Sequence, residues 1–289
     1  MELTSNIAFA LLNGIVWGVV LALASSGLNV IYGLLGIVNV AHGSFYMLGA
    51  FFAWFVSFQL GSFWYSLVLV PPVIAILGIV VEFILRPVER NVSLSVLSTF
   101  AIMIGLQGAA LAAWGGTPRR LAPPIKANLG ILGTGYSYYR IFVALVGISL
   151  LLCLWWLSKR TKFGLQMRAA RENSNLSKAV GLPVPLLYSL GFGLGTALAG
   201  LSGVLIAPMV SITPDMGTRI FAIVFLIVIT GGLGNIWNSV VVAVGFSLTR
   251  GIVTAFFDPT TGLILTFAIV ISLVLIKSGS FPEIAGINQ

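Results

Sequence analysis

The sequence predicts an all-α protein that crosses a membrane many times. Of its 289 residues, 58% are hydrophobic and only 8% are charged, and the mean hydropathy is +1.09. Soluble domains carry roughly a quarter charged residues, so this chain cannot cover a water-facing surface with polar side chains. The single cysteine excludes a secreted disulfide scaffold. A nucleic-acid partner is excluded because no patch concentrates the basic residues.

Each predicted helix corresponds to one apolar run, since a membrane span needs about 20 mainly apolar residues. Nine runs are candidate spans: Ile7–Ala24, Phe45–Gln59, Phe63–Leu85, Val92–Trp114, Ile141–Leu157, Leu186–Ala207, Arg219–Thr230, Ile236–Phe257 and Gly262–Ile276. A tenth, Leu28–Val40, is short and rich in glycine, so we expect a short or broken helix there. The runs are too long for the strands of a membrane barrel. We predict nine to ten transmembrane helices in a single domain over residues 1–289.

Basic residues between the runs predict the orientation of the chain in the bilayer. Arg86 and Arg90 lie between two spans, and two crossings later a second loop carries six basic residues between Lys159 and Lys178. Cytoplasmic loops are enriched in Lys and Arg, so both loops are predicted to be cytoplasmic. Counting backwards, an inside N-terminus requires Leu28–Val40 to cross, which gives ten helices. If that run re-enters instead, the N-terminus lies outside and there are nine.

The water-facing segment over residues 160–185 contains one further predicted helix. Gly164–Val180 places apolar residues among basic and polar ones with the spacing of a short amphipathic helix, which Gly181 and Pro183 end. Such a helix can dock into a groove on a partner protein, with its apolar side chains as anchors. The alternative is a solvated loop between two spans, and composition alone does not separate the two.

The inventory of reactive residues argues against catalysis by this chain. The sequence has no Gly-rich phosphate-binding motif and no Gly-x-Ser-x-Gly nucleophile motif. One histidine, His42, and one cysteine, Cys153, are too few for a metal or haem site. Acidic residues fall mostly at span ends, which disfavours a carrier driven by protons or sodium ions. We expect a non-catalytic chain without metal or cofactor, whose transport energy comes from a partner or from the solute gradient.

Polar residues near or inside the apolar runs form two candidate sites. The candidates for the wall of a solute pathway are Asn29, Tyr32, Asn39 and His42. Interrupted helices are tolerated in a bilayer only where the freed backbone is buried or lines a cavity. The alternative role for these side chains is hydrogen bonding between closely packed helices. Separately, Glu82 and Arg86 are one helical turn apart, and we expect a structural ion pair between them.

Three stretches of the sequence carry a resemblance to a known family. The first is Gly27–Gly43 followed by Phe45–Ala50, and the second is Glu82 followed by Arg86-Pro87-Val88. The third combines Met167–Asn173 and Ala179-Val180-Gly181 with the later run Gly231-Gly232-Leu233-Gly234. Together they resemble the LivH-type permease subunit of the branched-chain amino-acid ABC importers. The resemblance covers nearly the whole chain in the correct order.

The resemblance implies a subunit of the bacterial inner membrane that forms a pathway with a second, LivM-like permease. Two cytoplasmic ATPases, which hold ATP and Mg²⁺, and a periplasmic substrate-binding protein complete such an importer. The residues it implies for ATPase docking are Arg168, Arg171, Glu172, Leu176, Ala179 and Gly181. The solute would be a branched-chain amino acid or a related small organic molecule such as an amide or urea. The competing hypothesis is an ATP-independent channel or facilitator for small neutral solutes.

Overall fold

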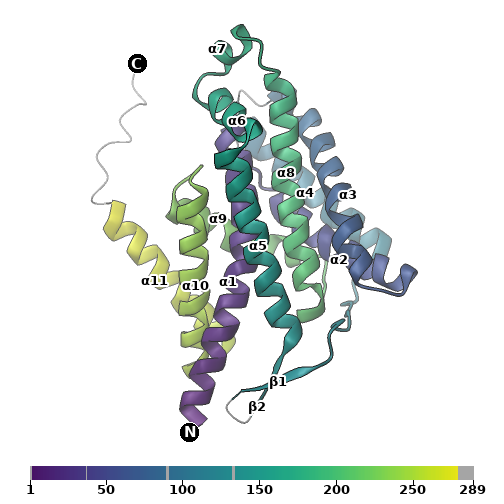
Figure 1. The fold of residues 1–289 in the computed structure, drawn as a ribbon, viewed down its shortest axis with the longest axis vertical. Helices are drawn as coiled ribbons and strands as arrows, with labels where there is room; N and C mark the ends of the chain where they lie inside the picture. The colour runs from purple at the N-terminus through teal and green to yellow at the C-terminus, as the bar shows by residue number, and fades with distance from the viewer. Residues whose placement is uncertain (1, 37, 89–90, 132–133, 279–289) are drawn as a thin grey trace.

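A computed structural model describes residues 2–36, 38–88, 91–131 and 134–278 as a bundle of long helices (Figure 1). The helices are α1 (Glu2–Leu35), α2 (His42–Leu60), α3 (Trp64–Leu85), α4 (Val92–Trp114), α5 (Tyr138–Arg160), α6 (Lys162–Glu172), α7 (Ser174–Ala179), α8 (Val184–Ile206), α9 (Met216–Gly231), α10 (Ile236–Phe256) and α11 (Pro259–Ser278). A two-stranded antiparallel hairpin, β1 (Asn128–Ile131) and β2 (Thr134–Ser137), precedes α5.

Seven of the described helices are long and apolar enough to cross a membrane, which confirms an all-α polytopic protein. They are α1, α2, α3, α4, α5, α8 and α10, some of them extended by an adjoining 3₁₀ turn. Two further apolar helical stretches are shorter, Met216–Gly231 of α9 and Thr260–Ser272 within the 20-residue α11. A count of nine to ten spans is therefore not confirmed.

The largest difference from the sequence prediction lies in α1. One helix of 34 residues replaces both the predicted span Ile7–Ala24 and most of the predicted short segment Leu28–Val40. The glycines of α1 serve close packing. At Gly27 the helix approaches the backbone of α8 so closely that a Cβ atom would collide with the carbonyl oxygen of Gly195. The helix ends at Gly36, which has a φ of +68°.

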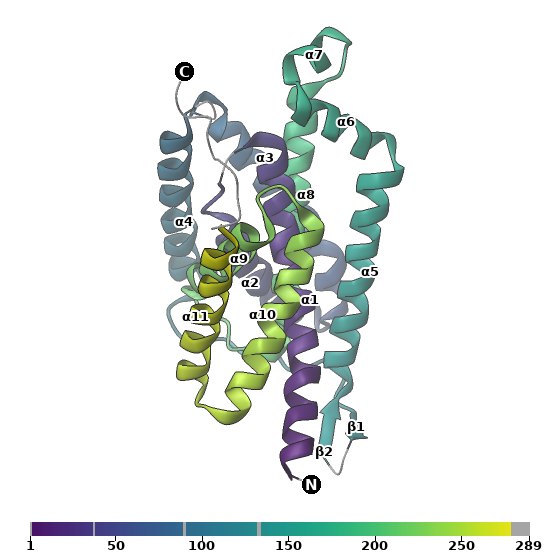
Figure 2. The same ribbon diagram turned by 90° about the vertical axis from the view of Figure 1, so that its left-hand side faces the viewer.

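The course of α1 distinguishes the two predicted topologies. Its N-terminal end lies beside the β1–β2 hairpin, at the opposite end of the molecule from α6 and α7 (Figures 1 and 2). This matches the alternative in which the N-terminus and the segment over residues 160–185 lie on opposite sides. The chain then turns back into the bundle, since α2 begins with His42 hydrogen-bonded to the carbonyl of Ala24, well inside α1.

Close packing of small residues holds the centre of the bundle together. Within the most apolar stretch of α8, 78% of the residues are buried, whereas the corresponding share for α4 is 17%. A Cβ atom at Gly203 of α8 would collide with the backbone of Tyr46 in α2, and one at Gly49 of α2 would collide with the backbone of Gly200. Helices in lipid associate through such small-residue contacts, because the hydrophobic effect provides little driving force between them. The outer faces of α3, α4 and α5 present large apolar side chains.

Two helices begin inside the bundle. The start of α2 at Gly43 touches the start of α9 at Gly217, again through glycine backbone. On the hairpin side, Arg119 and Ile212 pair as an isolated antiparallel bridge, which ties the loop after α4 to the segment between α8 and α9.

Candidate functional site

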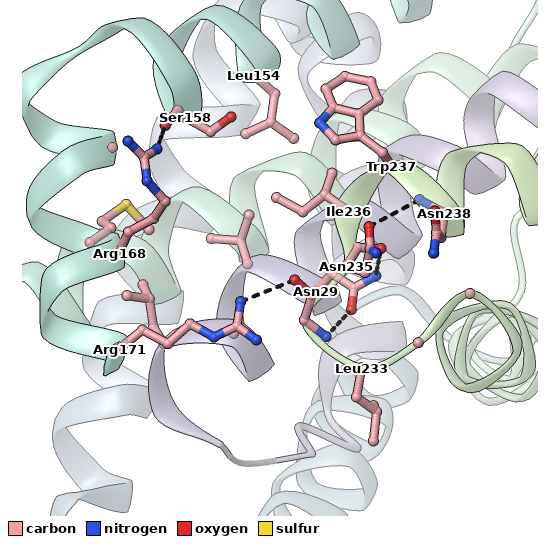
Figure 3. Close-up of a pocket in the computed structure, with 18 of the residues that line it drawn as sticks. Asn29, Leu154, Ser158, Arg168, Arg171, Leu233, Asn235, Ile236, Trp237 and Asn238 are labelled. Carbon is pink, nitrogen blue, oxygen red and sulfur yellow. Dashed lines mark hydrogen bonds between the residues drawn. The ribbon is translucent and has the colours of Figure 1, made fainter. Parts of the chain in front are cut away.

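A cavity of about 790 Å³ lies at the α6–α7 end of the bundle (Figure 3). Its walls come from the last turns of α1, the end of α5, the inner face of α6 and the connection between α9 and α10. The cavity therefore joins the segment predicted to dock a partner to five helices of the bundle, α1, α5, α8, α9 and α10.

One asparagine holds the α9–α10 connection against α1. The side-chain oxygen of Asn29 accepts a hydrogen bond from the backbone N–H of Gly234 at 2.8 Å. Its amide nitrogen donates to the hydroxyl of Ser239 at 2.6 Å and to the carbonyl of Asn235 at 3.4 Å. Asn29 is 1% exposed, so these bonds form in a buried environment. Asn29, a candidate for the pathway wall, therefore forms hydrogen bonds that fix the turn between α9 and α10.

The turn itself is built by glycine and by a helix cap. Gly232 and Gly234 have φ values of +95° and +79°, a region that side-chain-bearing residues rarely adopt. Asn235 then caps α10, its side chain accepting from the N–H of Asn238 at 3.2 Å. The run Gly-Gly-Leu-Gly-Asn is a recognisable turn-and-cap signal, but the sequence gives no sign that α1 is its partner.

The segment formed by α6 and α7, called the docking segment after its predicted role, reaches the same turn through Arg171. The guanidinium of Arg171 donates to the carbonyl of Gly234 at 3.3 Å. It lies over the position that a side chain at Gly234 would occupy, so glycine is needed there for space as well as for φ. Gly234 is thus bonded by two helices: its carbonyl by Arg171 of α6 and its N–H by Asn29 of α1.

The docking segment is two helices, and the single helix predicted over Gly164–Val180 is a misassignment. Asn173 has φ −153° and ψ 97°, which interrupts the helix, and its side chain accepts from the N–H of Leu176 at 2.9 Å to begin α7. The helix therefore stops at the Asn173 cap even though the amphipathic spacing of the sequence continues past it. Gly181 turns the chain toward α8 with a φ of +84°.

The outer surface of this segment presents exposed side chains, several of them apolar. Leu165 is 60% exposed, Leu176 is 62% exposed and Val180 is 70% exposed. Of the residues that the family resemblance implies for docking, Arg168, Glu172 and Ala179 are also exposed. Isolated helices of this length are unstable in water unless their other face is packed.

The inner face of α6 provides that packing. Ala170 is buried together with Val184 and Leu187 of α8. Gly164 packs against the backbone carbonyls of the last turns of α5, where a side chain would collide. Arg168 donates a hydrogen bond to the carbonyl of Ser158. The docking segment is therefore attached to α5, to α8 and, through Arg171, to the α9–α10 turn.

The other three candidate pathway residues do not line this cavity. The backbone N–H of His42, the first residue of α2, donates to the carbonyl of Asn39 at 3.1 Å, so Asn39 lies in the turn just before this helix. The His42 ring bonds the carbonyl of Ala24 at 2.9 Å, while neither side-chain polar atom of Asn39 has a partner among the described residues. Tyr32 is half-buried near the end of α1. Of the four residues, Asn29 alone is found in the wall of the cavity described above.

Glu82 and Arg86 form a bidentate ion pair at the end of α3. The guanidinium donates to the two carboxylate oxygens at 2.9 and 3.1 Å. Ser189 of α8 donates to the carboxylate at 2.8 Å and accepts from Arg86 at 2.7 Å. Glu82 is 3% exposed, so the network links α3 to α8 at a buried position.

Comparison with known proteins agrees with this architecture. A probable branched-chain amino acid transport permease protein, LivH, of Methanocaldococcus jannaschii is 29% identical over 90% of this chain and 86% of its own length. The permease protein BraD of Pseudomonas aeruginosa is 25% identical over 78% of this chain and 79% of its own length. LivH of Escherichia coli K12 is 21% identical over 91% of each chain.

A solved structure shares the fold. PsaBC from Streptococcus pneumoniae, in complex with Fab, matches with a TM-score of 0.50 and 16% identity, covering 91% of this chain and 90% of that chain. The family model described as the permease component of the branched-chain amino acid transport system matches residues 10–275. This chain belongs to that family of permease components.

Proposed function

We propose that this permease is the membrane-embedded part of an ATP-driven importer in a bacterial inner membrane. Its solute is a branched-chain amino acid or a related small organic molecule such as an amide or urea. A second, LivM-like permease completes the pathway, and a periplasmic binding protein delivers the solute. Two cytoplasmic ATPases bind ATP and Mg²⁺, so this chain carries out no covalent chemistry.

The observation that carries the proposal is the construction of the α6–α7 segment. It projects from the bundle (Figure 1) and presents Leu176 and Val180 outward, the side chains that a protein groove would cover. Its inner face is tied to the turn that Asn29 holds, so a displacement of α6 moves the α9–α10 connection. A partner bound to α7 would therefore act on the membrane helices through a short, packed path.

The experiment is solute uptake into vesicles that contain the two permeases, with and without the ATPases and the binding protein. We expect concentrative uptake of leucine only when ATPases, ATP and binding protein are all present. Competition by valine, acetamide and urea then ranks the solute classes. Undiminished uptake in vesicles without any ATPase would overturn the proposal and favour the facilitator.

A further inference from the structure

The cavity beside α6 has a positively charged rim. Lys159 at the end of α5 and Arg168 and Arg171 of α6 all line it, and all three side chains are exposed. None of the residues found to line it is Asp or Glu. Arg168 and Arg171 each use part of the guanidinium on a carbonyl, of Ser158 and of Gly234, and their other N–H donors have no partner among the described residues.

The walls below this rim are apolar and belong to membrane helices. Leu34 comes from α1, Leu154 and Leu157 from α5, and Val242 from α10. In Figure 3 the side chains of Leu154 and Ile236 lie on the same side as Trp237, away from Arg171. The cavity thus joins cations to hydrocarbon surface at the ends of the spans, where lipid headgroups meet acyl chains.

We infer that this cavity binds an anionic phospholipid of the surrounding bilayer. Its phosphate is recognised by Lys159, Arg168 and Arg171, and its hydrocarbon lies along the leucine-lined walls. Basic pockets between membrane helices on the cytoplasmic side bind such headgroups. A zwitterionic lipid is disfavoured, because its cationic group finds no carboxylate among the lining residues. A free anion would leave the apolar walls uncovered.

The site has a consequence for the link between the docking segment and the bundle. Arg171 and Gly234 both line the cavity and bond each other. A lipid held there contacts α6 and the α9–α10 turn at once, and it stabilises their contact without touching the outer surface of α7. Lipid binding itself does not depend on which solute is carried.

The chain offers a matched control for charge. Arg160 is exposed and adjacent to Lys159, but it does not line the cavity, and its guanidinium carbon lies over the ring of Trp155, 6.0 Å from the ring centre. Gly33 offers a control of the opposite kind. A Cβ atom there would meet only ordinary contacts, 3.7 Å from Gly234 and 3.8 Å from Arg171, so a larger side chain fills the cavity while every charge remains.

The test is native mass spectrometry of the full complex after reconstitution with equal amounts of phosphatidylglycerol and phosphatidylcholine. We expect the native complex to retain phosphatidylglycerol preferentially. Lys159→Gln and Arg168→Gln should each reduce retention about fivefold, the effect of one basic residue near an anionic surface. Gly33→Leu should reduce retention with all charges present, and Arg160→Gln should leave it unchanged.

Several outcomes would overturn the site. Equal retention of phosphatidylcholine would remove the argument from charge. An equal loss with Arg160→Gln would point to a diffuse surface effect, and full displacement by inorganic phosphate would point to a free anion. Unchanged retention in Gly33→Leu, with normal elution of the complex, would place the lipid elsewhere. Recovery of the ATPases with each variant is measured in the same spectra, because Arg168 is also one of the residues implied for docking.

Discussion

At the scale of single residues, Asn29 is the clearest case of a role that the sequence could not supply. A polar residue in an apolar run signals a specific partner, because its desolvation must be offset. The sequence does not identify that partner, which lies 205 residues further along the chain at Gly234. Glu82 and Arg86 are the opposite case, since a local spacing of four residues predicts their contact directly.

We expect Asn29→Leu to loosen the α9–α10 turn without preventing insertion. The substitution keeps a similar volume but leaves the N–H of Gly234 and the hydroxyl of Ser239 without their partner. An unsatisfied buried group costs about 1–3 kcal/mol, so thermal denaturation of the purified permease pair should occur at a lower temperature. Asn238→Leu is the control, because Asn238 is exposed and only its backbone N–H takes part in the cap. If Asn29→Leu melts at the same temperature as the unsubstituted protein, the turn does not depend on the bonds to Asn29.

At the scale of elements, sequence reasoning located the apolar helices better than it located their breaks. The segment Leu28–Val40 looked broken because of its glycines, yet Gly33 lies within an unbroken α1 and the helix stops only before Gly36. Within a bilayer an exposed backbone group has no water to bond, so glycine there serves close packing more than interruption. The break in the docking segment at Asn173 was missed for the converse reason. In water-facing surroundings a single side-chain cap can end one helix and begin the next.

The exposed surface of α7 provides an element-scale prediction. Ala179 is exposed, so Ala179→Trp adds bulk to the outer surface and should leave the bundle intact. If α7 enters a groove on an ATPase, the added side chain should weaken co-purification on the order of tenfold, as truncation or overfilling at a central interface residue does. The control is Leu152→Trp, which adds an indole to an exposed position of α5 far from α7. Equal recovery of the ATPase with both variants would exclude α7 as the docking element.

At the scale of the whole molecule, the two ends of the bundle differ in character. One end carries α6, α7 and the basic residues from Lys159 to Lys178, and the other carries the hairpin and the N-terminal end of α1 (Figure 2). Charge counting predicted the cytoplasmic side of the basic segment but left the side of the N-terminus open. It could not predict that α2 and α9 both start inside the bundle, because the contact between Gly43 and Gly217 joins residues that are distant along the chain. Such a start shows in the sequence only as a shorter apolar run.

The orientation of the molecule gives a prediction that one labelling experiment can decide. The only native cysteine, Cys153, is exposed and is first replaced by alanine. Single cysteines are then introduced at Asn175 in α7 and at Asn128 in the hairpin, two exposed asparagines at opposite ends of the bundle. Because basic loops are retained in the cytoplasm, a membrane-impermeant maleimide added to sealed cells should label Asn128→Cys and spare Asn175→Cys. Opening the cells should make Asn175→Cys reactive, which shows that the residue is accessible from inside. Labelling of Asn175→Cys in sealed cells would invert the molecule, place α7 outside, and remove the ATPase from the face where we propose that it binds.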